Sequence, residues 1–253
     1  MIENIKAGID ITRRSFEDRF ASSAFYNRQT QDEEHLKKIL SFIEIKAGMK
    51  ILDLGTGSGY LAFPLAESNP GSEITGLDIV RNTLEANRKR AASEGIANLS
   101  FTDYDGIDFP FEDCSFDMVV TRYALHHFPD IDHSVGEISR ILKSGGSLFI
   151  SDPYPDECDK DRFIDELLRI KQDGHIKFYS KEEWVSICGR HGLNISDGFD
   201  SKIRFPQKKD TVPGYEELMN RHGRTVTGSY HMEETDTEIY ITQGVNNLLF
   251  VKK

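Results

Sequence analysis

The chain has 253 residues, a formal net charge of −11 at pH 7 and a sequence pI near 5.2, so a general affinity for nucleic-acid phosphates is not expected. Its apolar runs are too short to span a membrane, and its three distant cysteines indicate neither a disulfide framework nor a metal site. We expect a cytoplasmic protein with one α/β domain and no membrane or nucleic-acid partner, and the oligomeric state stays open.

Short apolar segments alternate with helical ones through the first two thirds of the chain. A polar arm, residues 1–47, comes first, with helical spacing of apolar residues over 33–46. The expected strands that follow are 50–54, 73–78, 99–102, 116–121 and 146–151, and the expected helices are 60–68, 82–94 and 133–142. Such alternation requires crossover connections, so it predicts a mainly parallel, doubly wound sheet with helices on both faces.

The sequence becomes more polar and charged after Asp152. Residues 153–180 are interpreted as a cap insert with a helix around 162–170. Ser180 and Glu183 form a capping-box start for a helix over 181–191. The remaining expected elements are strands at 194–205 and 239–251 and a short helix near 215–219. These segments amount to seven expected strands in one domain, in which 48–152 is the core and 181–253 completes the domain.

A glycine-rich turn follows the first expected strand, which ends in Asp53. Gly55, Thr56, Gly57 and Gly59 form this turn, and its alternate glycines let the backbone approach a ligand because no Cβ intervenes. The following helix points its N-terminal amides at the turn. A dinucleotide fingerprint places its third glycine three positions after the second, whereas here it comes one position early. The D-x-G-x-G-x-G spacing resembles the first motif of class I S-adenosylmethionine-dependent methyltransferases.

Three further segments strengthen this resemblance. Asp78 closes the second strand, where its two oxygens can accept both hydroxyls of an adenosine ribose, although a carboxylate there also suits a helix cap. The run 104–111, followed by Ser115-Phe116-Asp117, resembles the methyltransferase run G-D-A-x-x-L-P-F followed by S-F-D. Residues 121–129 carry an H-H-F run similar to that of ubiquinone and menaquinone biosynthesis methyltransferases. The resemblance is strong over 48–152 and weaker to about 192. It implies a Rossmann-like, seven-stranded sheet with an antiparallel C-terminal strand, in which 48–152 is the cofactor-binding core.

The resemblance implies a cofactor, S-adenosyl-L-methionine, with S-adenosyl-L-homocysteine as product, and no metal. In the family, an aspartate and the amide after it contact the adenine, which implies those roles for Asp105 and Gly106, with Asp103 and Asp108 as alternative carboxylates. The ammonium group of the cofactor's amino-acid tail is expected to bind Asp53 and the Gly55 carbonyl. The carboxylate of the same tail is expected to bind nearby amides or Arg122. The other residues expected to bind the cofactor are Thr56, Gly57, Gly59, Asp78 and Ile79.

The candidate catalytic residues are His126 and His127, because imidazole titrates near neutral pH and can take a proton from a nucleophile. The adjoining Phe128-Pro129 equally suits a packed structural histidine. We expect in-line methyl transfer to a small-molecule acceptor, accelerated mainly by positioning. Whether oxygen, nitrogen or carbon is methylated stays open. Further candidates for the acceptor pocket are His175, Tyr154 and Tyr179 in the cap, and Tyr26 in the arm is a candidate for closing over the donor.

Two alternatives belong to other classes of protein. An NAD-dependent oxidoreductase would also place an acid at the end of the second strand, but the early third glycine speaks against it. A non-catalytic nucleoside-binding protein would keep the same fold, because fold alone does not fix function.

Overall fold

The protein is built around a central sheet with strand order β3-β2-β1-β4-β5-β8-β6, in a computed structural model that describes residues 2–21 and 31–253. Its strands are β1 (Lys50–Leu54), β2 (Glu73–Asp78), β3 (Leu99–Asp103), β4 (Phe116–Arg122), β5 (Leu142–Pro153), β6 (Leu193–Lys208) and β8 (Glu238–Lys252). Neighbouring strands from β3 to β5 pair in parallel, and β8 is antiparallel to both β5 and β6. The predicted fold class is confirmed. A two-residue strand that the sequence did not predict, β7 (Glu233–Glu234), also pairs with β8.

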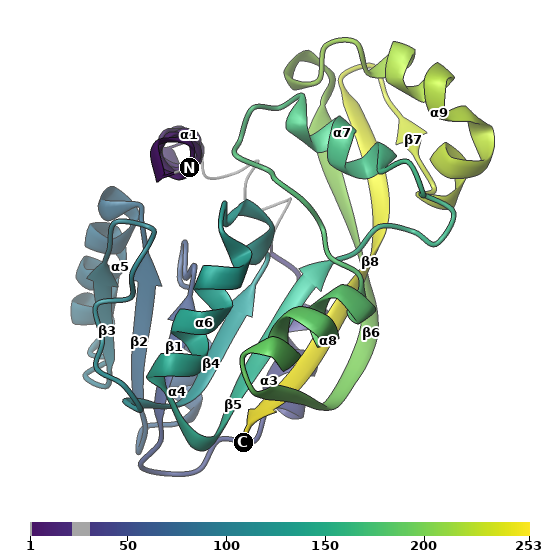
Figure 1. Ribbon diagram of the computed structural model, residues 1–253. Coiled ribbons are helices and arrows are strands. Elements are labelled where there is room, and N and C mark those ends of the chain that lie inside the picture. Colours follow the sequence, from purple (N-terminus) through teal and green to yellow (C-terminus); the bar gives the residue numbers. More distant parts are fainter. Residues whose placement is uncertain (1, 22–30) are drawn as a thin grey trace.

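Helices cover both faces of the sheet (Figure 1). Those on one face are α3 (Glu33–Phe42), α4 (Ala62–Ser68) and α5 (Arg81–Glu94), and those on the other are α6 (Ile131–Ile141) and α8 (Lys181–Arg190). The side chains of β1 explain this layering. Ile51 packs into the core on the α3–α5 side, whereas Leu52 and Leu54 pack into the core on the α6–α8 side. A strand with apolar residues on both faces must lie in the middle of such a sandwich.

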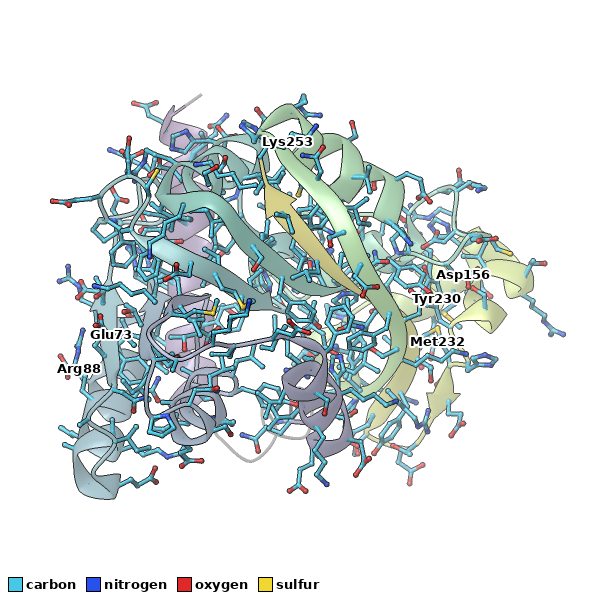
Figure 2. The ribbon with its side chains drawn as sticks, turned by 90° about the horizontal axis from the view of Figure 1, so that it is seen from below. Glu73, Arg88, Asp156, Tyr230, Met232 and Lys253 are labelled. Carbon is cyan, nitrogen blue, oxygen red and sulfur yellow. The ribbon has the colours of Figure 1, made fainter. Side chains whose placement is uncertain are left out.

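The ends of β6 and β8 extend beyond the sheet and carry a second body of structure, which we call the hairpin lobe. It comprises α7 (Phe163–Arg169), η2 (Lys209–Thr211), α9 (Tyr215–Ser229), β7 and the strand segments 203–208 and 238–245. The lobe has its own apolar core. Figure 2 shows Asp156, Tyr230 and Met232 at this end of the molecule and Glu73 and Arg88 at the other. The predicted short helix is α9, which continues past a kink at Gly223.

The N-terminal helix α1 (Ile2–Ala21) lies above the carboxyl ends of the parallel strands, across from the hairpin lobe (Figure 1). Its Arg13 guanidinium donates to the carbonyl oxygens of Ile79 at 3.3 Å and Asp105 at 3.4 Å. These bonds attach the arm to the loops after β2 and β3. Tyr26 lies outside the described residues. Within the described ranges, no helix has both the length and the apolar character that crossing a bilayer requires.

Candidate functional site

A cavity of about 190 Å³ lies at the carboxyl ends of the parallel strands, between α1 and the hairpin lobe. Open α/β sheets bind ligands at this edge. Most of the side chains and turns predicted from sequence line it: Asp53, Gly55, Thr56, Gly57, Asp78, Ile79, Gly106, Arg122, His126 and His127. Gly59 and Asp105 do not belong to the lining. The structure thus brings residues from four separate sequence motifs to one cavity.

The glycine-rich turn is shaped by close packing as well as by its place at the cavity. Gly55 has a φ of 69°, and a Cβ there would lie 2.4 Å from the Cβ of Ala124. Only glycine therefore lets the turn lie directly against the segment after β4. Gly59 has a φ of 77°, and a Cβ there would lie 2.5 Å from the Phe63 ring. Gly59 faces helix α4 instead of the cavity, so its observed contacts are those of packing.

Asp53 is a buried carboxylate at the end of β1. Its Oδ2 accepts hydrogen bonds from Thr56 Oγ1 at 2.7 Å and from the Ala62 amide at 3.1 Å. Burial raises the pKa of Asp53 to about 7, because removal from water disfavours the charged form. Both hydrogen bonds from described residues go to the same oxygen, and the side chain lines the cavity. Asp53 is therefore placed to pair with a cationic ligand group.

Asp78 has two structural tasks in addition to its place in the cavity lining. Its Oδ2 accepts from the Gly57 amide at 2.8 Å, and its Oδ1 accepts from the Val80 amide at 3.0 Å, next to the start of α5. Burial raises the pKa of this carboxyl. Asp78 thus holds the glycine turn against β2 and also binds the amide of Val80, the residue just before α5. The two roles weighed from sequence, ligand contact and helix start, are compatible at this position.

The loop after β3 presents different atoms to the cavity than the sequence motif suggested. Asp105 is exposed, and its Oδ1 accepts from the amides of Ile107 at 2.9 Å and Asp108 at 3.3 Å, which closes a turn. Its neighbours Tyr104 and Gly106 line the cavity instead.

The alternative carboxylates in this loop are engaged elsewhere. Asp103 is paired with Arg81 at 2.8 Å, and Asp108 is paired with His133 at 2.9 Å. Neither lines the cavity. The backbone around Gly106, more than any carboxylate of this loop, therefore faces the ligand space.

Arg122 lies between two aromatic rings at the end of β4. Its guanidinium carbon is 4.0 Å from the Tyr60 ring centroid and 3.8 Å from the Tyr123 ring centroid, within the range of cation–π attraction. Its Nη2 is buried and has no hydrogen-bond partner among the described residues. A buried donor without a partner is unfavourable, so this nitrogen is suited to an anionic ligand group.

His35 in α3 contacts the Arg122 guanidinium, and no sequence pattern predicted this contact. Its Nδ1 lies 3.5 Å from Arg122 Nε, and its Nε2 lies 2.9 Å from Asn247 Oδ1 on β8. Burial lowers the pKa of His35, which favours the neutral ring. A neutral imidazole can accept from the guanidinium without adding a like charge.

His126 lies on the short helix η1 (Leu125–His127), and its ring is fixed by Asp152 at the end of β5. The His126 Nδ1 to Asp152 Oδ1 distance is 2.7 Å, and Asp152 is only 1% exposed. Because a carboxylate accepts, the proton of the neutral ring is on Nδ1, and Nε2 is the basic nitrogen. Asp152 was not predicted, although it is an acid at the end of a parallel strand, as Asp53 and Asp78 are.

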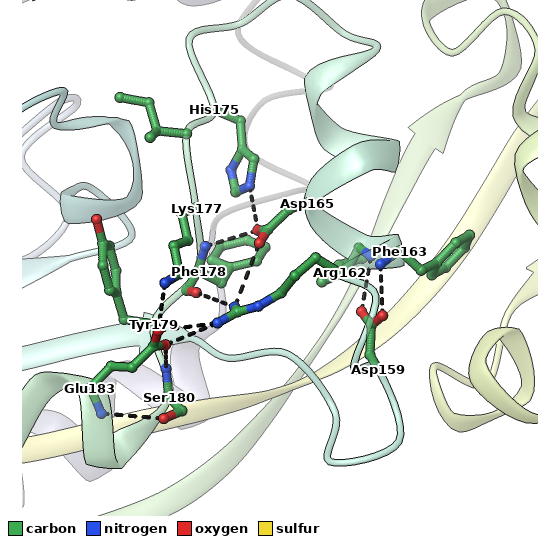
Figure 3. A network of polar contacts seen from close by, with 12 residues as sticks. Asp159, Arg162, Phe163, Asp165, His175, Lys177, Phe178, Tyr179, Ser180 and Glu183 are labelled. Atoms are coloured by element: carbon green, nitrogen blue, oxygen red, sulfur yellow. Dashed lines mark hydrogen bonds and ion pairs between the residues drawn. The ribbon is translucent and has the colours of Figure 1, made fainter. Parts of the chain in front are cut away.

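His127 and His175 have different surroundings from His126. The His126 ring centroid lies 4.3 Å from that of His127 and 5.4 Å from that of His175. Burial lowers the pKa of His127 well below its usual range, and its Nδ1 is buried without a partner among the described residues. Burial also lowers the pKa of His175, whose Nε2 lies 2.8 Å from Asp165 Oδ1 (Figure 3). In the described part of the chain, no three His, Cys, Asp or Glu side chains form a possible metal site.

The cap is anchored to the core by the polar network of Figure 3. Arg162 donates to the Phe178 carbonyl at 2.7 Å and to the Glu183 carboxylate of α8 at 3.1 Å. Phe178 and His175 consequently form a fixed wall of the cavity. Tyr154 and Tyr179, the two tyrosines of the cap, do not line the cavity. Tyr179 packs on Trp184 instead, with their ring centroids 4.8 Å apart.

Comparison with known proteins agrees with this architecture. Residues 45–192 match the family model described as "Methyltransferase domain". The chain is 32% identical over 165 residues to an uncharacterized methyltransferase, YcgJ, of Bacillus subtilis, covering 65% of this chain and 64% of that protein. It is 37% identical over 105 residues to a demethylmenaquinone methyltransferase of Thermus thermophilus, covering 42% of this chain and 47% of that protein. These curated relatives are therefore matched over about half to two thirds of their length.

Solved structures extend the likeness over most of the fold. The crystal structure of Bacillus subtilis YcgJ superposes with a TM-score of 0.75 at 24% identity, covering 88% of this chain and 99% of that one. A putative methyltransferase from Bacillus halodurans superposes with a TM-score of 0.70 at 20% identity, covering 87% and 99%. The chain belongs to the methyltransferase domain family, with the Rossmann-like fold of class I S-adenosylmethionine-dependent methyltransferases, as its motifs predicted.

Proposed function

We propose that the protein transfers the methyl group of S-adenosylmethionine to a small-molecule acceptor by in-line displacement. The observation that carries this proposal is one cavity lined by Asp53, Asp78 and Arg122 at one end and by His126, whose ring is held by Asp152, beside them. The relatives named demethylmenaquinone methyltransferase support an acceptor of aromatic or quinone type.

The donor fits the residues at its end of the cavity group by group. Asp53 would hold the ammonium of the amino-acid tail, and the unpartnered Nη2 of Arg122 would hold its carboxylate. Asp78 would accept from the ribose hydroxyls. The adenine would lie beside Ile79 and Gly106, with Asp105 acting through its turn. Both charges of the tail would then meet an opposite charge of the protein.

The chemistry assigned to the protein is proton transfer and positioning. When bound, the donor supplies an electrophilic methyl group on a sulfonium. His126 Nε2 accepts the proton of the acceptor's hydroxyl or enol as the nucleophile forms, and the buried Asp152 carboxylate stabilises the resulting imidazolium. His127 and Phe178 hold the acceptor in place, because a near-attack arrangement supplies most of the rate advantage.

The proposal is tested by titrating the protein with S-adenosylmethionine and S-adenosylhomocysteine in a calorimeter, followed by mass spectrometry of a mixed acceptor panel. We expect saturable binding of both compounds and methylation of at least one aromatic acceptor. No binding at near-millimolar concentration would contradict the proposal. Binding without turnover across the panel would favour a non-catalytic binding protein, and quenching of reduced nicotinamide fluorescence would favour a dehydrogenase.

Replacing Asp78 with alanine is expected to weaken donor binding by about 1–3 kcal/mol, because the ribose hydroxyls lose their acceptor. Asp103→Ala is a matched control, since Asp103 is the register partner of Asp78 on β3 but does not line the cavity. Circular dichroism checks that the variant keeps its overall secondary structure. Unchanged affinity in a folded Asp78→Ala protein would remove Asp78 from the ribose site.

Donor affinity is expected to rise with pH between about 6 and 8, because burial raises the pKa of Asp53 to about 7 and only its ionised form attracts the ammonium. Below pH 7 the affinity should fall by up to about tenfold per pH unit. The raised pKa also affects the free energy of unfolding of the ligand-free protein. The contribution of Asp53 to this free energy is fully present below pH 3.8, the pKa in the unfolded chain, and is lost as the pH rises through about 7. Calorimetry of Asp53→Asn should show weaker binding without this pH dependence.

A further inference from the structure

Gln243 occupies a buried position on β8 at which the strand pattern calls for an aliphatic residue. Ile239, Ile241 and Val245 lie on the same face of β8 as Gln243, because every second residue of a strand points to the same side. These three side chains form part of the core of the hairpin lobe. Gln243 is 1% exposed, so its amide is withdrawn from water on the same apolar face.

Neither polar atom of this amide has a partner within the described part of the chain. Both Oε1 and Nε2 of Gln243 are buried without a hydrogen bond, and the residue directly opposite on β6 is Ile203, which offers none. An amide that gives up water and gains no partner is unfavourable, so such groups call for an explanation. Gln243 lines the cavity, and a ligand in that cavity is the explanation that the geometry supplies.

The surroundings of Gln243 indicate what kind of ligand would fit. The hairpin lobe and cap contribute apolar walls, among them Leu168, Phe178, Ile203 and Phe205. Lys171 is paired with Asp173 at 3.1 Å. The buried carboxylates of Asp152 and Asp165 each hold a histidine. Asp152 faces the neutral ring of His126, so its negative charge disfavours an anionic ligand, and the apolar walls disfavour a hydrated cation. This end of the cavity therefore favours an uncharged molecule with apolar faces.

We propose that Gln243 recognises the methyl acceptor, and that the acceptor is a neutral aromatic ring with a hydroxyl next to a carbonyl. The inference rests on the proposed function and names the substrate class of the same site. The Nε2 amide would donate to the carbonyl oxygen, and the hydroxyl would exchange its internal hydrogen bond with that carbonyl for one to Oε1, so that both unpaired atoms gain a partner. The ring itself would pack against Phe178 and Phe205.

The test compares three small probes that differ only in these two groups. 2,4-Dihydroxyacetophenone carries the hydroxyl–carbonyl pair, resorcinol lacks the carbonyl, and 4-hydroxyacetophenone lacks the adjacent hydroxyl. Their affinities are measured by calorimetry on the full chain saturated with S-adenosylhomocysteine. For the wild-type protein we expect 2,4-dihydroxyacetophenone to bind about tenfold more tightly than either of the others.

Gln243→Met keeps the length of the side chain and removes both hydrogen-bonding atoms. We expect it to abolish the preference for 2,4-dihydroxyacetophenone, to leave S-adenosylhomocysteine affinity unchanged and to raise the melting temperature of the ligand-free protein, because an unpaired amide is lost. Gln243→Leu provides a second variant. Ile241→Val is the matched control, since it alters the same strand face without touching the cavity lining, and its preference should equal that of wild type.

Three outcomes would overturn this inference: equal or undetectable binding of the three probes to wild type, a preference that survives in Gln243→Met, or tighter binding of ethanolamine than of any of them. Failure of S-adenosylhomocysteine to bind the wild-type protein would instead overturn the proposed function, and this inference with it. The two failures are therefore distinguished by the first titration.

Discussion

Replacing His126 with glutamine is expected to lower kcat by about 10²- to 10⁴-fold, the usual contribution of a positioned general base. Glutamine keeps a polar side chain of similar reach, but it cannot take a proton. The 2.7 Å contact of the His126 ring with Asp152 leaves Nε2 as the basic nitrogen in a cavity that the donor and acceptor would share. The measurement is single-turnover methyl transfer with saturating S-adenosylmethionine.

Donor binding and pH separate a lost base from a damaged site. Affinity for S-adenosylhomocysteine should stay near the wild-type value in His126→Gln, and its residual rate should rise with pH as the acceptor ionises by itself. His133→Gln is the matched control, because His133 lies on the surface beside Asp108 and outside the cavity lining. An unchanged kcat in His126→Gln would show that the acceptor needs no base from the protein.

Arg122→Ala is expected to weaken S-adenosylmethionine binding by about 10- to 150-fold, which corresponds to the loss of about 1.5–3 kcal/mol from a charge-assisted hydrogen bond. The reason is the buried Nη2, which has no partner among the described residues and which we assign to the carboxylate of the donor. Calorimetry with 5′-methylthioadenosine, which lacks the amino-acid tail, should give nearly equal affinities for variant and wild type.

A second arginine provides the control for this experiment. Arg90 also stacks on an aromatic ring, with its guanidinium carbon 3.8 Å from the Phe63 ring centroid, but it lies outside the cavity lining. Arg90→Ala should therefore leave both affinities unchanged. Equal losses for S-adenosylmethionine and 5′-methylthioadenosine in Arg122→Ala would mean that Arg122 supports the shape of the cavity and does not bind the tail.

The residues that we assign to the donor could be predicted from sequence to lie together, because they follow a rule of the fold. Acids and glycines at the carboxyl ends of β1 and β2 must come together once the strands are parallel, and Asp53 and Asp78 do so. The same rule would have found Asp152 at the end of β5. Asp105 shows where a local motif is insufficient, because its carboxylate closes a turn and the neighbouring residues line the cavity.

The part of the cavity that we assign to the acceptor depends on contacts that no local sequence pattern contains. The helix α1 and the hairpin lobe reach the cavity only through tertiary packing, and their sequences carry no motif that predicts it. The contact of Phe16 with His127 therefore could not be predicted from sequence. Their ring centroids lie 5.1 Å apart in an edge-on arrangement. Gln243 is visible in the sequence only as an amide among the aliphatic residues that alternate along β8. A ligand contact is indicated only by the structure, in which both polar atoms of this amide are buried without a partner among the described residues.

The central claim is that one cavity at the ends of β1, β2 and β4 binds an adenosyl sulfonium compound by its charges. A crystal structure of the protein with S-adenosylhomocysteine tests this most directly. We expect the ammonium of the ligand at Asp53, its carboxylate at Arg122 Nη2 and its ribose at Asp78, with the sulfur facing His126. A ligand bound elsewhere, or one with its tail directed away from Asp53 and Arg122, would contradict it.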